Sequence, residues 1–154
     1  MIYKESDQQL LKQGFIKKCP VDYKAIKNLI ARAYADIKTA KRNFSDDKEC
    51  AYTYSYNALL HSGLALIFSK GFRPEIKKKH LTIIKFASAV LGDEFKRLIN
   101  DYDFMRKKRH KFIYEPGIPC SLKEAKDAIK IAEEFVNKIY KIIKSSLSQR
   151  ELDF

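Results

Sequence analysis

Apolar residues recur every three or four positions along nearly the whole chain, which is the spacing that places them on one face of an α-helix. The pattern predicts helices over residues 6–17, 22–44, 45–71, 74–92, 93–116 and from 121 toward the C-terminus. No stretch of any length alternates apolar with polar residues, which is the pattern of a half-buried strand. The expected fold is all-α, a single-domain up-and-down bundle of five to six helices.

Residues that favour helix starts mark two of these boundaries. Asp46 with Glu49, and Ser121 with Glu124, have the three-residue spacing of a capping box. Between them, the stretch YNALLHSGLALIF is apolar almost all round and predicts a buried central helix.

The chain divides into a short first part and a long second part. Its 154 residues suit one domain that buries about two-thirds of the surface of the unfolded chain. Residues 1–20, which end at Cys19-Pro20, are expected to form an N-terminal extension with a short helix. Residues 21–150 are expected to form the bundle.

Composition narrows the class of protein. An apolar fraction of 45% excludes a disordered polyelectrolyte, and 32% charged residues exclude a membrane protein. The N-terminus, MIYKESDQQLL, lacks the layout of a signal peptide. Cys19, Cys50 and Cys120 are odd in number and widely spaced, which predicts free thiols in a reducing compartment. We therefore expect a cytoplasmic protein that contacts no membrane.

The formal net charge of +12 is high for this length. Such a field attracts polyanions: a nucleic acid, a nucleotide, an acidic protein or a membrane surface. An alternative explanation is general enrichment in lysine, because lysines are spread over the whole chain. Charge alone does not decide between these explanations.

The segment RKKRHKFIYEP, residues 106–116, carries the candidate chemistry. The buried stripe of the fifth predicted helix continues in steps of three and four onto Arg106, Arg109 and Ile113. A guanidinium stays charged at any usable pH, so a buried one requires a carboxylate or a groove that an anion enters. Two simpler explanations are the preference of helix C-termini for cations and the reach of long arginine side chains toward solvent.

Other polar residues of the segment surround this stripe. His110 and Tyr114 follow Arg106 by four and eight positions and are expected on the same side of the helix. Lys107, Lys108 and Lys111 are expected on the solvated face, where they are candidates for contacts to nucleic acid.

Three stretches give this chain a resemblance to a known family. They are SYNALLHSGLALIFSKGFRP, KKKHLTIIKF and DYDFMRKKRHKFIYEP, followed by a long closing helix. In this order, over roughly residues 21–145, they resemble the HEPN domain superfamily. Active members carry an arginine, a polar residue and, after a few positions, a histidine. Here Arg109 and His110 match the first two, whereas Tyr114 stands at the histidine position, as in a branch of the superfamily whose motif ends in tyrosine.

The resemblance implies a function and partners. It implies a metal-independent endoribonuclease without cofactor, in which Arg109 and Arg106 neutralise the phosphate, His110 acts as base and Tyr114 positions the phosphate. It also implies a homodimer with a composite site and a place in a prokaryotic toxin–antitoxin or nucleotidyltransferase-linked pair. Two alternatives stay open: a non-catalytic module that binds RNA, nucleotides or a nucleotidyltransferase-type partner, and a plain helical interaction protein with an acidic partner.

The remaining histidines favour packing over chemistry. His61 lies in the most apolar segment and His80 replaces an apolar residue, so each is expected to be a core histidine bonded to a neighbour. Their wide separation, and that of His110, predicts no metal site. Alternating tyrosines in the central helix are expected to pack with polar tips, with base stacking as the alternative. These tyrosines are Tyr52, Tyr54 and Tyr56.

Overall fold

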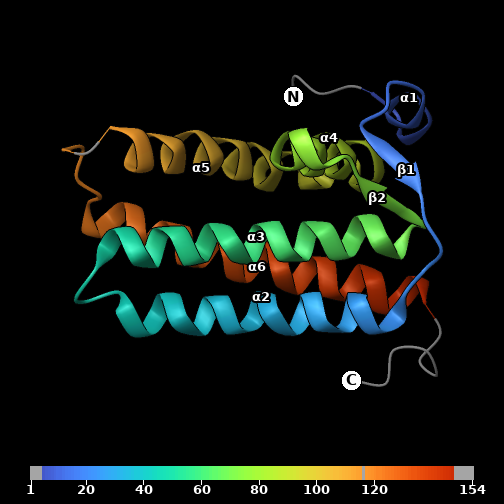
Figure 1. Cartoon of the computed structure of the whole chain (residues 1–154). Helices are drawn as coiled ribbons and strands as arrows, with labels where there is room; N and C mark the ends of the chain where they lie inside the picture. Colours follow the sequence, from blue (N-terminus) through green and yellow to red (C-terminus); the bar gives the residue numbers. More distant parts are fainter. Residues whose placement is uncertain (1–4, 116, 148–154) are drawn as a thin grey trace.

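The computed structural model describes residues 5–115 and 117–147, and it is an all-α bundle as predicted (Figure 1). Its elements in chain order are α1 (Asp7–Lys12), β1 (Ile16–Lys18), α2 (Tyr23–Asn43), α3 (Lys48–Ser69), β2 (Phe72–Pro74), the 3₁₀ turn η1 (Ile76–Lys78), α4 (Lys79–Leu91), the 3₁₀ turn η2 (Asp93–Phe95), α5 (Lys96–Tyr114) and α6 (Leu122–Ser146).

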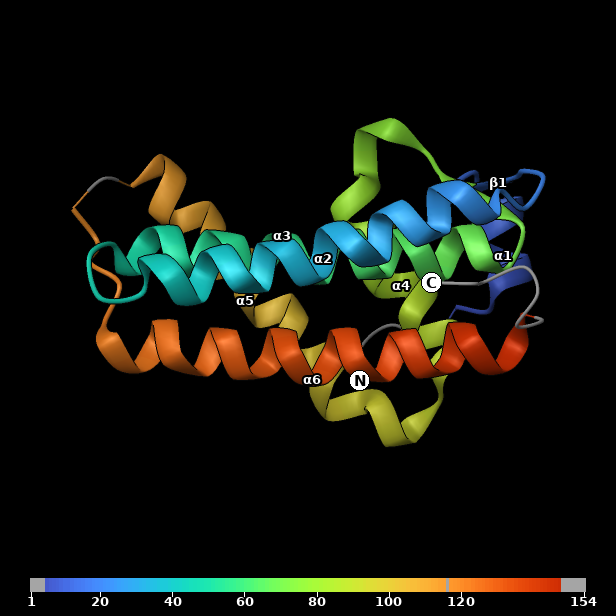
Figure 2. The same ribbon diagram turned by 90° about the horizontal axis from the view of Figure 1, so that it is seen from below.

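Helix α3 is the centre of the bundle, because it contacts α2, α4, α5 and α6. Figure 1 shows it between α2 on one side and α4 and α5 on the other, with α6 behind. The long helices α2, α3 and α6 run side by side, whereas α5 crosses them obliquely (Figure 2). Burial on several sides explains why α3 is apolar almost all round. The largest fully buried side chains include Tyr56, Tyr102, Phe86, Phe135 and Leu59.

Beside the helices, two short strands pair into a small sheet that the all-α bundle accommodates. β1 lies antiparallel to β2, with Ile16 opposite Pro74 and Lys18 opposite Phe72. The first helix was predicted over residues 6–17 but ends at Lys12, and the chain turns at Gly14, whose φ of +81° suits glycine. Three residues per strand are too few for an alternating pattern to be recognised, so only the pairing itself defines this sheet.

Two helix starts test the capping predictions. Ser121 and Glu124 form the predicted capping box at the start of α6. At the start of α3, however, the cap is Asp47, whose side chain accepts a hydrogen bond from the backbone N–H of Cys50 at 2.9 Å. The predicted capping box with Asp46 was wrong by one residue.

Helices α3 and α4 meet at a glycine. A Cβ atom added at Gly63 would clash with the side chain of Ile83. The absence of a side chain therefore lets α4 approach α3 closely. This close approach places His80, at the start of α4, against Tyr56 of α3.

The described residues include neither a helix that could span a membrane nor a cluster that could hold a metal ion. None of their helices combines the length and the hydropathy that a bilayer crossing requires. Residues 5–115 and 117–147 contain no group of three or more His, Cys, Asp or Glu side chains that could hold a metal ion. The three cysteines carry free thiols, with Cys120 buried and Cys19 and Cys50 partly exposed.

Candidate functional site

Arg106 and Arg109, which continue the buried stripe of α5, lie in two different environments. Arg106 is 29% exposed, and its Nε and Nη2 donate hydrogen bonds to Oδ1 of Asp103 at 3.0 and 2.8 Å. Asp103 is itself buried, one helical turn earlier. An internal carboxylate therefore compensates the charge of Arg106.

Arg109 has no such compensation. Its guanidinium carbon lies 5.2 Å from the centre of the Tyr56 ring, within the range of a cation–π contact. Its Nε is buried without a hydrogen-bond partner, and no carboxylate of residues 5–115 or 117–147 forms an ion pair with it. An unsatisfied buried donor costs about 1–3 kcal/mol. Such a group is stabilised by any acceptor that enters from solvent.

Tyr56 links Arg109 to a histidine on another helix. The hydroxyl of Tyr56 and Nδ1 of His80 are 2.6 Å apart in a hydrogen bond. The two rings are stacked, with centroids 5.7 Å apart and planes 13° from parallel. Helices α3, α4 and α5 each supply one member of this row of Arg109, Tyr56 and His80.

The surroundings keep both linked rings uncharged near neutral pH. Burial raises the pKa of Tyr56 to about 12, although Arg109 and Arg106 oppose that rise. Burial is the largest cause that lowers the pKa of His80 below its ordinary 6.5, followed by the charges of Arg109, Lys79 and Arg106. A neutral imidazole accepts a proton or a hydrogen bond, which an imidazolium does not.

His80 opens onto a depression of about 340 Å³ at the start of α4. Arg106 lines the same depression from α5, so the two helices share its wall. The other lining residues are Ile76, Lys77, Lys78, Lys79 and Leu81. Its charged side chains are all cations, which suits an anion of the size of a phosphate group.

His110 and Tyr114 lie apart from this depression, on the exposed last turn of α5. Their rings contact each other, with centroids 4.5 Å apart. Arg109 instead turns inward onto Tyr56. The described chain thus brings Arg109 together with Tyr56 and His80, while His110 and Tyr114 form a separate aromatic pair.

The three predicted nucleic-acid lysines differ in their contacts. Lys108 forms an ion pair with Glu124 of α6 at 3.1 Å and is 24% exposed, so it joins the two helices. Lys107 is 61% exposed and contacts Asp103 at 3.4 Å. Lys111 is exposed. Lys107 and Lys111 are therefore the two whose charges are the more accessible to a ligand.

The sequence favoured packing for both His80 and Tyr56, with base stacking by Tyr56 as the alternative, and it assigned neither to the predicted site on α5. Tyr56 is fully buried, and His80 has the hydrogen-bonded neighbour that a core histidine was expected to have. His80 is nevertheless only partly buried and faces the depression. The available signal was the run KKKH at residues 77–80, where three cations precede a histidine at an apolar position.

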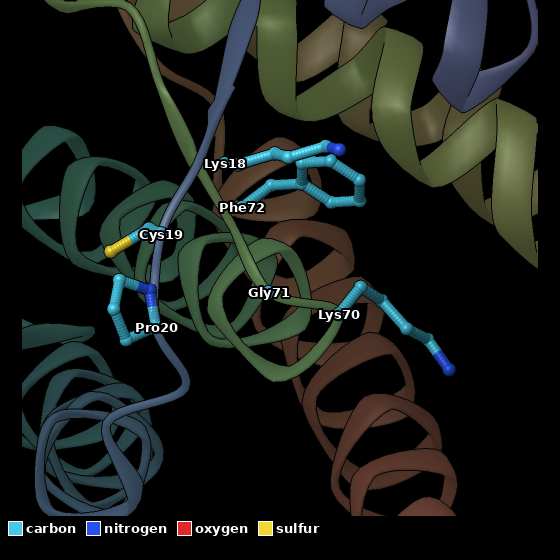
Figure 3. Close-up of a pocket in the computed structure, with 6 residues that line it drawn as sticks. All are labelled: Lys18, Cys19, Pro20, Lys70, Gly71 and Phe72. Atoms are coloured by element: carbon cyan, nitrogen blue, oxygen red, sulfur yellow. The ribbon is translucent and has the colours of Figure 1, made fainter.

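A larger depression of about 520 Å³ lies where β1 meets the end of α3 (Figure 3). Its lining includes Lys18, Cys19 and Lys70. Figure 3 shows the two ammonium groups and the Cys19 sulfur pointing in different directions. Because its polar groups do not converge, this depression is not a candidate site.

Comparison with known families identifies the fold. The family model of the HEPN domain matches residues 26–143, which include α3, α4, α5 and most of α2 and α6. The chain belongs to the HEPN family. Neither a curated protein nor a solved structure matches it. Arg106, Arg109, Tyr56 and His80 all lie within the matched region of this HEPN chain.

Proposed function

We propose that this HEPN protein binds RNA through its backbone phosphates, with Arg109 as the anchor. The observation that carries the proposal is the guanidinium of Arg109, which lies on Tyr56 with a buried Nε that lacks a partner. Phosphate oxygens accept hydrogen bonds from arginine in a bidentate manner, and charge-assisted bonds of this kind are the strong ones. At Arg109, the phosphate of the ligand takes the role that the Asp103 carboxylate has at Arg106.

Neighbouring charges support an extended ligand over a single small anion. Lys107 and Lys111 lie along α5, and Lys77, Lys78 and Lys79 lie around the depression. Several cations spread over two helices suit a chain of phosphates, because each contact releases counterions from the polyanion.

Exposed rings support a single-stranded ligand. Tyr114 is 69% exposed near the end of α5, and its ring contacts that of the exposed His110. Unpaired bases stack on such rings, which is the usual way in which proteins recognise single-stranded RNA. The ligand proposed here is therefore single-stranded RNA.

Binding to a labelled single-stranded RNA, followed by fluorescence anisotropy, tests the proposal. Arg109→Ala is expected to weaken binding about 10- to 100-fold, because one charge-assisted pair is lost. Arg109→Lys keeps the charge without the planar fork and is expected to bind with intermediate affinity. Arg42→Ala removes an exposed arginine near the end of α2 and serves as the matched control. Equal affinity of the Arg109→Ala and Arg42→Ala proteins would refute the proposal.

We further infer that two copies associate through α5. Phe104 leaves a large apolar side chain exposed in the middle of this helix, and burial of such area favours association. Sedimentation equilibrium is expected to show a homodimer, and Phe104→Asp is expected to shift it toward monomer. A monomeric wild-type protein at high concentration would contradict this inference. The nucleotidyltransferase-type partner and the toxin–antitoxin setting stay predictions.

A further inference from the structure

A second depression, of about 210 Å³, lies between α5 and α6 and shares no lining residue with the one at the start of α4. Its charged lining side chains are all carboxylates, with Asp101 from α5 and Glu124 and Asp127 from α6. The chain as a whole has a formal net charge of +12 and repels cations over most of its surface. A cation that binds this protein therefore requires a local acidic site, and this depression is such a site.

The depression also contains a buried polar group without a partner. Tyr52 of α3 lines it and is 2% exposed. Its hydroxyl has no hydrogen-bond partner among residues 5–115 and 117–147. Burial raises the pKa of Tyr52, and the nearby charge of Glu124 adds to that rise, so the hydroxyl stays protonated. Its oxygen is free to accept a hydrogen bond from a ligand that carries N–H donors.

The rest of the lining is apolar. Met105, Ala128 and Ile131 contribute aliphatic atoms from α5 and α6. Phe104, which is 64% exposed and belongs to the inferred dimer surface, lies at the rim. Aliphatic walls suit the methylene groups of a ligand, and aromatic rings attract ammonium groups through cation–π contacts.

We propose that this depression binds an aliphatic polyamine, a flexible chain of methylene groups that carries several ammonium groups. Carboxylates, an unpartnered phenol oxygen and aliphatic walls match the two parts of such a molecule. A metal ion suits the site less, because the described residues include no group of three or more His, Cys, Asp or Glu side chains that could hold one. The proposed RNA site uses other residues, so this inference does not rest on it.

The arrangement of the two helices favours more than one ammonium group. Arg97 pairs with Glu134 at 2.6 Å, and Lys108 pairs with Glu124 at 3.1 Å, so α5 and α6 run antiparallel. This alignment places the two lining aspartates on opposite walls, offset by about one helical turn, or about 5 Å. Two ammonium groups joined by a short methylene chain suit two carboxylates in these positions.

The existing ion pairs of these aspartates leave room for a ligand. Arg97 lies 3.2 Å from Asp101, and Lys123 lies 3.2 Å from Asp127. The side chains of Arg97 and Lys123 are 64% and 87% exposed, and exposed pairs of this kind contribute little to stability. Burial raises the pKa of Asp101 although Arg97 opposes that rise, so its charge is incompletely compensated. A ligand ammonium group therefore replaces these partners at small cost.

Isothermal titration calorimetry with spermidine tests the proposal, using full-length protein freed of nucleic acid, at a concentration at which sedimentation shows a single species. The wild type is expected to bind one spermidine per chain. Asp101→Asn and Asp127→Asn are each expected to weaken binding at least about tenfold, because each removes one charge-assisted contact. Tyr52→Phe removes only the hydroxyl and is expected to weaken binding about threefold. Asp46→Asn, at an exposed position outside the depression, is the matched control and is expected to bind as the wild type does.

Two competitors separate a polyamine site from a merely acidic surface. A neutral aliphatic diol of the same length is expected not to bind, and an equal concentration of Mg²⁺ is expected to leave spermidine bound. Spermidine is also expected to raise the melting temperature of the wild type and not that of Asp101→Asn, since only a protein that binds the ligand is stabilised by it. This second measurement also shows that the variant is folded.

Three results would overturn the proposal. They are a wild type that binds no spermidine, equal affinity of the Asp101→Asn and Asp46→Asn proteins, and displacement of spermidine by an equal concentration of Mg²⁺. None of them affects the binding of RNA through Arg109, which the anisotropy assay tests separately.

Discussion

Two histidines of α3 and α4 have opposite surroundings. His61 of α3 bonds through Nδ1 to Asp36 of α2 at 2.6 Å, and Arg32 donates to the other oxygen of the same carboxylate at 3.1 Å. His80 of α4 bonds to the neutral hydroxyl of Tyr56, and cations surround it. The first histidine bonds to a carboxylate, whereas the carboxylate near the second, Asp103, bonds to Arg106 instead.

The difference separates a polar cluster satisfied from within the fold from the one that the proposed function uses. Asp36 is 1% exposed, so its two partners satisfy a carboxylate that solvent does not reach. Beside His80, the cationic Arg109 has a buried Nε that no residue of the described ranges satisfies. Natural proteins seldom keep such a group without a ligand to bind, since its presence destabilises the folded state. Changes in and around the two clusters test this contrast.

Removing the anion of the first cluster is expected to destabilise the protein most. Asp36→Asn removes the carboxylate to which Arg32 and His61 both bond, and the free energy of unfolding is expected to fall by about 3 kcal/mol. Urea denaturation measures this change. Asp46→Asn, at an exposed position, is the matched control and is expected to have little effect. Equal stability of the two variants would contradict the structural role of the cluster.

Separating α3 from α4 is expected to have the next largest effect. Gly63→Ala introduces a Cβ that clashes with Ile83, and overpacking of this kind costs about 2 kcal/mol. Because Ile83 and His80 share α4, the hydrogen bond between His80 and Tyr56 is expected to weaken too. The double variant Gly63→Ala with Ile83→Ala removes the clash, and it is expected to be more stable than the sum of the two single changes predicts. Strict additivity would contradict the close contact.

Removing the unsatisfied cation is expected to stabilise the protein while weakening its binding of RNA. Arg109→Met replaces a buried donor by an apolar side chain of similar length, and the free energy of unfolding is expected to rise by about 1 kcal/mol. Affinity for RNA is expected to fall in the same variant. Arg42→Met is the control, with unchanged stability expected. A loss of stability in Arg109→Met would show that Arg109 has a structural role.

The charge state of His80 is expected to make stability depend on pH. Its folded pKa lies below the unfolded value of 6.5, so the unfolded chain binds more protons and stability falls as pH decreases below 6.5. Between pH 7 and pH 5, the melting temperature of the wild type is expected to fall more than that of His80→Gln. Identical pH dependence of the two proteins would show that the pKa of His80 is not lowered.

Changing the exposed histidine of the motif is expected to have the smallest effect. His110 contacts Tyr114 at the exposed end of α5, outside the depression. His110→Ala is expected to weaken RNA binding by less than about threefold, against the roughly 10- to 100-fold loss expected from Arg109→Ala. The reverse order of the two effects, measured in the same anisotropy assay, would place the anchor at His110 and not at Arg109.

The sequence by itself determined the helices, the buried centre and the presence of cations where apolar residues were expected. These features follow from the repeat of apolar residues, which reflects the geometry of one helix. It also pointed to Arg109, which lies at the continuation of a buried stripe.

Only the tertiary structure decided which charges are compensated. Asp103 lies near both arginines in the sequence yet bonds to Arg106, while Arg109 turns onto Tyr56, 53 positions earlier in the chain and thus beyond any local pattern. The strand pair and the contact between Tyr56 and His80 also join residues far apart in sequence. Helical periodicity predicts which face of a helix is buried, but not which other helix packs against that face. The candidate site depends on such packing, because its residues come from three different helices.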